Sequence, residues 1–228
     1  WTTDVISDTQ IEYGLTTAYG SSTALNGTLS TGHSQTVTGL QANQLYHYKV
    51  KSRDVSGDMA TSGDRTFITA MGATTPGTST DSGNSNTMNA TRFTTGSGGK
   101  LASLSAYVGA VDASAANRSF QLAIYTANGT APGTLVANTA TGTLTANAWN
   151  TLPIVATLAP ATNYFIAYNS NGSNSTVNNL RFTNGGTSGW STNGQTFGNW
   201  PANFGPVTAQ SVTFSLYASF IGDSTPPS

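Results

Sequence analysis

The chain has 228 residues, a formal net charge of −1 and only 7% charged residues, against about 25% in a typical globular protein. Its eight Lys and Arg residues are scattered, which excludes a basic surface for nucleic acid or anionic lipid, and no apolar run is long enough for a membrane span. The absence of Cys excludes disulfides and thiolate metal sites.

The first part of the chain, residues 1–70, contains the segments "WTTD", "TQIEYGLTTAYG" and "VTGLQANQLYHYKVKSRDVSGDMATSG". These segments resemble a fibronectin type III domain. The spacing from Leu40 to Tyr46 resembles the tyrosine corner of such sandwiches, in which a phenol at the start of a strand hydrogen-bonds back to the preceding loop. Period-two alternation then predicts that Tyr46, Tyr48 and Val50 face the core.

This fibronectin-like unit is incomplete. In the family that it resembles, the Trp of "W-T-T-D" ends the second strand, so the resemblance implies that the first two strands of a sandwich of ~100 residues are missing. Two explanations stay open. Either the strands simply lie outside this fragment, or a neighbouring chain or repeat supplies them, in trans or in cis, because an open sheet exposes unpaired backbone groups.

Residues 71–89, within "MGATTPGTSTDSGNSNTMNA", lose the apolar rhythm and are rich in Gly, Ser, Thr and Asn. This composition predicts a linker. It separates the first unit from a longer one that spans residues 90–222.

The longer unit is predicted to be a larger, jelly-roll-like β-sandwich, because short β-rich runs alternate with turn signals and no helical periodicity of useful length occurs. The clearest alternation lies in "QSVTFSLYASFI", residues 210–221, with one face expected to be buried and the other, which includes Ser215 and Tyr217, expected to be wet. Leu158 to Tyr164 repeats the spacing of Leu40 to Tyr46 and predicts a second tyrosine corner. The chain as a whole is therefore predicted to be all-β.

Residues 90–221 also resemble a family of secreted bacterial β-sandwich modules of poorly defined role. The resemblance rests on "RFTTGSGGKLASLSAYVG", "FQLAIYTANGTAPGTLVANT", "NAWNTLPIVATLAPATNYFIAYNS" and "FGNWPANFGPVTAQSVTFSLYASF". Such modules occur beside fibronectin-like domains in long extracellular proteins, which implies an extracellular or cell-surface location. Residues 223–228, "DSTPPS", resemble the start of a further fibronectin-like domain.

The inventory of reactive side chains argues against an enzyme. Between residues 90 and 221 the only carboxylate is Asp112, and that stretch has no Glu, His or Cys. A glycosidase carboxylate pair, a Ser-His-Asp arrangement and a His-based metal site are thereby excluded from the second unit. His33 and His47, in the first unit, are predicted to be surface residues. No cofactor is expected; a structural calcium ion at Asp112 or Asp81 would have a single carboxylate per loop, which is a weak ligand set.

The segment "GGTSGWSTNGQTFGNWPANFGP", residues 185–206, carries large aromatic residues where no regular strand is expected. One interpretation is a site for neutral glycans, with Trp190 and Phe197 as stacking faces and Asn193, Gln195 and Asn199 as the hydroxyl-binding amides. The other is internal packing of the long loop, which is favoured for a turn made by the following three residues: Trp200, Pro201 and Phe204.

The function predicted from these observations is a non-enzymatic structural or adhesive module of a long repetitive extracellular protein. Its expected partners are neighbouring copies or repeats of the same protein, with strand completion between neighbours as one mode of assembly. The alternative is a carbohydrate-binding module accessory to a secreted polysaccharide-degrading enzyme, with neutral glycans as its partners.

Overall fold

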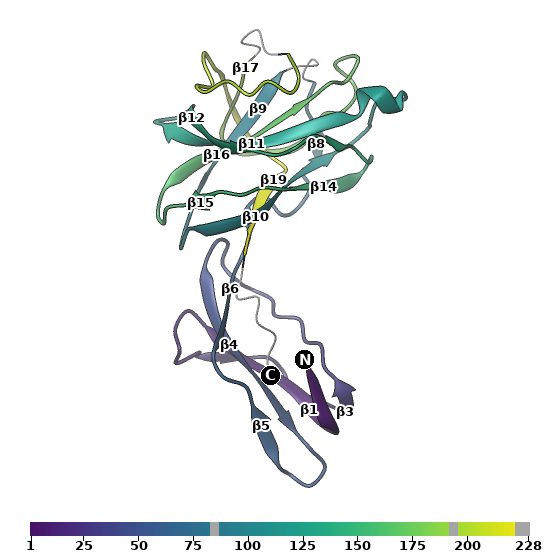
Figure 1. The fold of residues 1–228 in the computed structure, drawn as a ribbon, viewed down its shortest axis with the longest axis vertical. Helices are drawn as coiled ribbons and strands as arrows, with labels where there is room; N and C mark the ends of the chain where they lie inside the picture. Colours follow the sequence, from purple (N-terminus) through teal and green to yellow (C-terminus); the bar gives the residue numbers. More distant parts are fainter. Residues whose placement is uncertain (83–86, 192–195, 222–228) are drawn as a thin grey trace. The chain divides into compact units, whose positions relative to one another are not determined.

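The computed structural model describes residues 1–82, 87–191 and 196–221, and these ranges consist mainly of antiparallel β-strands (Figure 1). The one helical segment among them is a short 3-10 helix, η1 (Ala115–Asn117). No helix in the described part of the chain is long and apolar enough to cross a bilayer. The all-β prediction is confirmed. The chain divides into two compact units, whose main spans are Trp1–Thr69 and Ala70–Phe220.

The first unit is built around one long strand that takes part in two pairings. The strands are β1 (Thr2–Gly14), β2 (Ser21–Ser22), β3 (Asn26–Gly32), β4 (Leu45–Arg53), β5 (Met59–Thr61) and β6 (Arg65–Ile68). The first half of β1 pairs with β3 through two register shifts, and its second half pairs with β4 on one side and β2 on the other. Both β5 and β6 pair with β4.

The tyrosine corner predicted for this unit is confirmed. The backbone N–H of Gln41 donates a hydrogen bond of 3.0 Å to the Tyr46 hydroxyl, at the start of β4. Tyr46 and Val50 are buried, as the alternation predicts, and Tyr48 is half-buried. The buried hydrophobic residues among the described residues of this unit are Ile11, Tyr46 and Val50.

The second unit is a sandwich of two antiparallel sheets with jelly-roll-like connections. The small sheet contains β7 (Met71–Gly72), β10 (Gly99–Val108), β14 (Ala148–Pro153), β15 (Thr157–Leu158) and β19 (Leu216–Phe220). The large sheet contains β8 (Ser79–Thr80), β9 (Met88–Thr94), β11 (Ser119–Asn128), β12 (Ala131–Asn138), β13 (Gly142–Thr143), β16 (Asn163–Ser170), β17 (Arg181–Ser191) and β18 (Thr208–Phe214). The chain passes repeatedly between the sheets, for example from β9 to β10 to β11.

The core of this unit lies between the two sheets and is closed. Leu104 and Ala106 of the small sheet and Leu122, Ile124 and Ile166 of the large sheet are fully buried. The second tyrosine corner is also confirmed, because the backbone N–H of Ala159 donates 3.1 Å to the hydroxyl of Tyr164.

The segment predicted as a linker contributes strands to the second unit instead. Met71 pairs with Ala218 of β19 and is 1% exposed, and β8 pairs with β17. Gly77 lies so close to the Phe182 backbone that a Cβ atom would meet it at 2.2 Å. Pairings of two residues are too short to show a period in the sequence, which is why the composition resembles that of a linker. Residues 223–228, predicted to start a further domain, lie outside the described residues.

The segment 210–221 is two strands rather than one. β18 belongs to the large sheet and β19 to the small sheet, and Ser215 lies between them. Ser215 is 1% exposed and was wrongly expected on the wet face. It is buried because its backbone bonds to both sheets: its N–H donates to the Arg181 carbonyl of β17, and its carbonyl accepts the N–H of Tyr107 of β10. Its hydroxyl accepts the N–H of Gly77.

Candidate functional site

The aromatic turn after β17 packs against the outer face of the large sheet. Phe204 is fully buried, and its ring meets that of Tyr125 edge-on at 5.0 Å. The Tyr125 hydroxyl donates 2.9 Å to the Pro201 carbonyl, and the Trp200 Nε1 donates 3.1 Å to Oε1 of Gln121. This loop cluster consists of seven buried residues with Trp200 and Val207 packed against it: Met88, Ala90, Ala123, Tyr125, Phe165, Ala167 and Phe204. The packing interpretation of Trp200, Pro201 and Phe204 therefore holds.

The loop cluster explains why β11 and β16 are buried on both faces. Their sequences, "SFQLAIYT" and "NYFIAYNS", read as one buried and one wet face, but Gln121, Ala123 and Tyr125 are buried as well. A sheet covered on both sides has strands that are apolar almost throughout. The covering element here is a loop of the same chain, so the part of this face formed by Ala123, Tyr125, Phe165 and Ala167 is buried.

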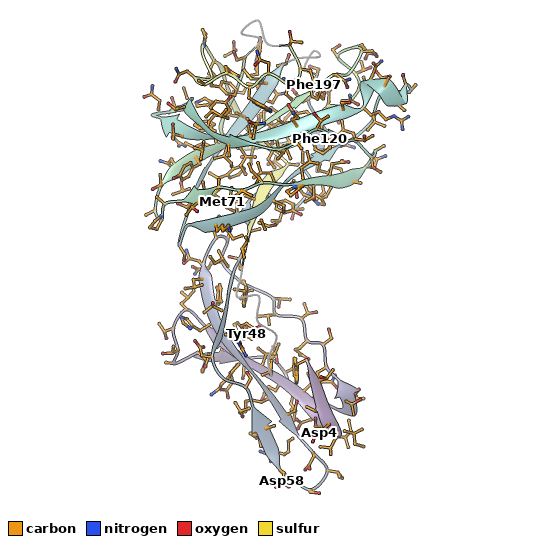
Figure 2. The ribbon with its side chains drawn as sticks, viewed as in Figure 1. Asp4, Tyr48, Asp58, Met71, Phe120 and Phe197 are labelled. Atoms are coloured by element: carbon orange, nitrogen blue, oxygen red, sulfur yellow. The ribbon has the colours of Figure 1, made fainter. Side chains whose placement is uncertain are left out.

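The predicted glycan site is only partly described. Asn193 and Gln195 lie outside the described residues. Phe197 is half-buried in the turn before Trp200, and Asn199 is exposed. Figure 2 labels Phe197 in the loop region of the second unit.

Trp190 does not join the loop cluster. It pairs with Asn89, whereas Gly189 pairs with Ala90 of the cluster. Directly opposite residues of an antiparallel pair share a face and successive residues alternate, so the half-buried Trp190 projects from the opposite face of the large sheet. The structure thus separates Trp190 from Trp200 and Phe204.

An unpaired extended stretch in the first unit is a second candidate site. We call residues 34–38, "SQTVT", the unpaired segment. No backbone hydrogen bond is formed by these five residues within the described part of the chain. Their burial nevertheless alternates: Gln35 and Val37 are half-buried, and Ser34, Thr36 and Thr38 are exposed. The segment has the side-chain pattern of a strand without a strand partner.

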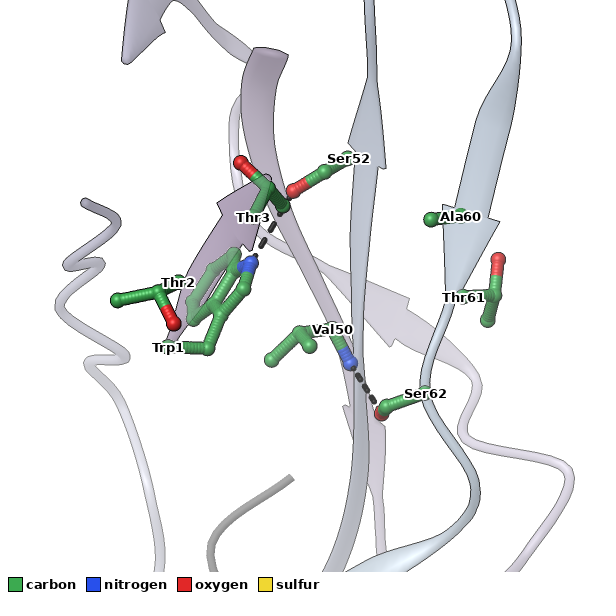
Figure 3. A pocket seen from close by; sticks show the side chains of 8 residues that line it. All are labelled: Trp1, Thr2, Thr3, Val50, Ser52, Ala60, Thr61 and Ser62. Carbon is green, nitrogen blue, oxygen red and sulfur yellow. Dashed lines mark hydrogen bonds between the residues drawn. The ribbon is translucent and has the colours of Figure 1, made fainter. Parts of the chain in front are cut away.

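The interior of the first unit opens to solvent near this segment's start. A hollow of about 110 Å³ lies beside Trp1, and Figure 3 shows its lining, with the Trp1 Nε1 donating to the Ser52 hydroxyl at 3.1 Å. Val50 lies in the same hollow, and its N–H donates 3.0 Å to the Ser62 hydroxyl. Val50, which is 7% exposed, is thus a core residue at the wall of a hollow that opens to solvent.

His33, directly before the unpaired segment, is buried and not on the surface as predicted. Its ring stacks on Trp1 at 5.0 Å, and its two nitrogens lie 2.9 Å from the Thr3 hydroxyl and 2.7 Å from the Thr9 hydroxyl. Burial lowers the pKa of His33 below its usual value, with a smaller contribution from the nearby N-terminal charge. His47 is half-buried on β4, with Nδ1 2.7 Å from Asp64.

Asp112 joins two loops of the second unit. One carboxylate oxygen accepts the N–H of Ser114 at 2.9 Å, and the other accepts the N–H and the hydroxyl of Ser173. These hydrogen bonds hold the pKa of Asp112 below its usual value, led by the bond from the Ser173 hydroxyl. Within the described residues no group of three or more His, Asp or Glu could hold a metal ion.

A group of aromatic residues that the sequence did not single out lies on the small sheet. Tyr107 of β10, Trp149 of β14 and Tyr217 of β19 are half-buried and in ring contact. The alternation of its segment places Tyr217 on the wet face. Tyr107 lies more than a hundred residues before Tyr217 in the sequence, and Trp149 lies about 70 residues before it. Only the strand order shows that the three side chains meet.

No protein-family model matches the sequence, and no curated protein matches it. Among solved structures, one similar chain is described by the words "carbohydrate-binding modules from the beta-sandwich super family". The two chains share 10% identity, the match covers 73% of this chain and 85% of the other, and the TM-score is 0.23. A likeness at this level assigns neither a family nor a function to this protein.

Proposed function

We propose that this chain is a non-enzymatic structural or adhesive module of a long, repetitive extracellular protein. In this proposal the first unit is a partial fibronectin type III sandwich that associates with a neighbouring copy or repeat through an added β-strand. The observation that carries the proposal is the unpaired segment, whose five residues form no backbone hydrogen bond within the described chain.

The strand order of the first unit supports the fibronectin-like assignment. One sheet of such sandwiches contains the third, sixth and seventh strands side by side. Here β1 and β4 are neighbours, and β5 and β6 follow on the far side of β4. The tyrosine corner at Tyr46 precedes β4, the position that it has in these sandwiches.

The exposure of apolar side chains supports an added strand. Residues 1–69 of the first unit, all of them described, include eight large hydrophobic residues that are at least one-third exposed, among them Val5, Ile6 and Leu25 at 51%, 51% and 58%. Unpaired N–H and C=O groups are a template for another strand, and exposed apolar side chains elsewhere in the unit could be covered by such a partner. The simplest partner is the same segment of a second copy, because antiparallel pairing of two identical edges gives a closed two-fold contact.

The small number of titratable groups in residues 90–221 supports a non-catalytic role. Its only carboxylate between residues 90 and 221 is Asp112, and both oxygens of that carboxylate accept hydrogen bonds from neighbouring loops. A carboxylate held in this way orders two loops and leaves no partner for general acid–base catalysis.

The test is the association state of the 228-residue chain as a function of concentration, measured by sedimentation velocity. We expect reversible dimers with a Kd of roughly 1–100 μM, in the range of weak protein interfaces. Thr36→Pro and Val37→Pro, measured separately, each remove one N–H, and neighbouring N–H groups point to opposite edges of a strand. At least one of the two is expected to abolish the dimer.

Val55→Pro is the matched control. Val55 is 79% exposed in the turn between β4 and β5, and no hydrogen bond of its N–H is found in the described chain. Proline is favoured at this position of a turn, so this variant is expected to dimerise as the parent does. A chain that stays monomeric throughout, or dimers that survive both substitutions in the unpaired segment, would contradict strand addition.

A second candidate function is the binding of neutral carbohydrate by the second unit. It is favoured by one specific observation, the three aromatic rings of Tyr107, Trp149 and Tyr217 on the small sheet. The rings are half-buried, so each presents part of its surface to solvent.

A further inference from the structure

The three rings come together through the register of the small sheet. Trp149 of β14 pairs directly with Tyr107 of β10, and Ser105 of β10 pairs with Thr151 on one side and with Tyr217 of β19 on the other. Directly paired residues share a face. The alternate residues of the central strand, Leu104 and Ala106 among them, are fully buried in the sandwich core, so the rings occupy the outer face of the sheet.

Small residues make room for the rings on this face. Ser105 lies in the central strand and is 0% exposed, although it belongs to the outer row, because larger neighbours cover it. The Trp149 ring lies 4.7 Å from that of Tyr217 at an interplanar angle of 71°, and 5.5 Å from that of Tyr107 at 78°. The indole therefore holds the two phenol rings in one contiguous aromatic surface.

The stretch of the outer face that holds the three rings carries no charge; Lys100 is exposed nearer the start of β10, where it pairs with Thr157. The residues of this stretch in the three paired strands are Ser103, Ser105, Tyr107, Trp149, Thr151, Pro153, Tyr217 and Ser219. Rings and hydroxyl groups alternate among them, with none of the ionisable groups that would select an anion or a cation. We call this set the aromatic face.

The polar atoms of the three rings are unused. Within the described residues, neither the two phenol hydroxyls nor the Trp149 Nε1 makes a hydrogen bond to the protein. The aromatic residues that serve packing differ in this respect. The Tyr125 and Tyr168 hydroxyls and the Trp200 Nε1 all donate to protein acceptors. Buried Tyr and Trp usually satisfy their polar atoms in this way, so the aromatic face offers three donors to a ligand.

We propose that the aromatic face binds a neutral polysaccharide. The C–H surface of a sugar ring would stack on the exposed parts of Trp149 and Tyr217, and the ring donors together with Thr151 and Ser103 would reach the sugar hydroxyls. Aromatic surface with a few convergent polar groups is typical of small-molecule sites. The face has no carboxylate, so the bound sugar is released unchanged.

This inference specifies the second candidate function and is independent of strand addition. The aromatic face belongs to the second unit, and the unpaired segment belongs to the first. A chain that dimerises without binding polysaccharide would support strand addition alone, and a chain that binds polysaccharide as a monomer would support the aromatic face alone.

The test is affinity electrophoresis of the 228-residue chain in gels that contain one soluble polysaccharide each: hydroxyethylcellulose, galactomannan, xylan or amylose as neutral polymers, and polygalacturonate as an acidic one. At least one neutral polymer is expected to retard the chain, and polygalacturonate is not. Trp149→Ala and Tyr217→Ala are each expected to weaken the retarding interaction by about tenfold or more, as central aromatic anchors do.

Trp190→Ala is the matched control, since it truncates a half-buried indole of the same unit that lies outside the aromatic face, and it is expected to leave retardation unchanged. If Trp149→Ala fails to fold, Thr151→Asp takes its place in the test. This substitution adds a carboxylate to the aromatic face at an exposed position and keeps all three rings, and it is expected to weaken retardation. The proposal is wrong if no neutral polymer retards the chain, if only polygalacturonate does, or if Trp190→Ala abolishes retardation while the substitutions in the aromatic face do not.

Discussion

The two units of this protein start a strand with the same device but enclose their interiors to very different degrees. In each, a backbone N–H five residues before the strand tyrosine donates to its hydroxyl, at Tyr46 and at Tyr164. Among the described residues, the first unit buries three hydrophobic residues. All the other buried hydrophobic residues belong to the second unit, and they include the loop cluster under the aromatic turn. The tyrosine corner therefore forms whether or not the unit encloses a large hydrophobic core.

The difference teaches where each unit has surface to offer. A closed sandwich can bind only through groups placed on the outside, and the second unit has such a group in the aromatic face. An open sheet edge exposes unpaired backbone groups, and the unpaired segment of the first unit is proposed to be such an edge. Two kinds of association, through a sheet face and through a strand edge, are therefore proposed for one chain.

The largest expected effect tests whether the aromatic loop is core. Phe204→Ala in the second unit is expected to lower the free energy of unfolding by about 3–5 kcal/mol, because a fully buried ring leaves a cavity. Val50→Ala at the open hollow of the first unit should lower it by only about 1.5 kcal/mol. Urea unfolding measures both, with Val155→Ala, at an 81% exposed residue, as the control. A loss below about 1 kcal/mol for Phe204→Ala would show that the loop is not part of the core.

A smaller effect tests whether the tyrosine corners are equivalent. Tyr46→Phe and Tyr164→Phe each remove one hydrogen bond at almost equal burial, 7% and 8% exposure. Each substitution is expected to cost about 1 kcal/mol, measured by differential scanning calorimetry on the transition of its own unit. Unequal losses would mean that closure of the sandwich determines how much a corner stabilises its strand.

The smallest expected effect concerns pH and the first unit alone. The pKa of His33 is lowered by burial, so the unfolded chain binds a proton at a pH where the folded unit does not. The contribution of His33 to the stability of the first unit is therefore fully present above the pKa of the unfolded chain, near 6.5. It is lost as the pH falls from there toward the pKa of the folded unit. The lowered pKa values of Glu12 and Asp64 act only at more acidic pH.

NMR titration of the His47→Gln variant checks this directly, because His33 is then the one histidine left in the chain. A midpoint clearly below 6.5 is expected. A midpoint at or above that value would contradict the burial of the ring between Trp1 and the Thr3 and Thr9 hydroxyls. Unfolding of the same variant at pH 7.5 and pH 5.5 then measures how much stability the first unit loses.

Features with a local signal were predictable from the sequence. The two tyrosine corners follow from a fixed spacing, and the all-β class follows from short alternating runs and frequent turns. The packed turn at Trp200, Pro201 and Phe204 was favoured for a similar reason, since a long loop needs a core of its own. The predicted glycan residues Trp190, Asn193, Gln195, Phe197 and Asn199 stay predictions, and Asn193 and Gln195 lie outside the described residues.

Features that depend on distant pairing were not predictable. The two-residue strands at Met71 and Ser79 have no periodicity of their own, so their composition alone indicated a linker. His33 is in a Ser/Thr-rich stretch but is covered by Trp1 and β1 once β3 pairs with it. The alternation of residues 210–221 hides the crossing at Ser215, because side chains keep alternating when a strand passes from one sheet to the next.

What the sequence by itself determined is the class of structure and the small number of titratable side chains in residues 90–221, because turn residues, period-two alternation and the inventory of ionisable side chains are all local or compositional. What only the tertiary structure decided is which surfaces stay open. Tyr107, Trp149 and Tyr217 meet because the strand order β14-β10-β19 places them on one face, and residues 34–38 are unpaired because no strand among the described residues lies beside them. Both outcomes depend on long-range hydrogen bonds between strands.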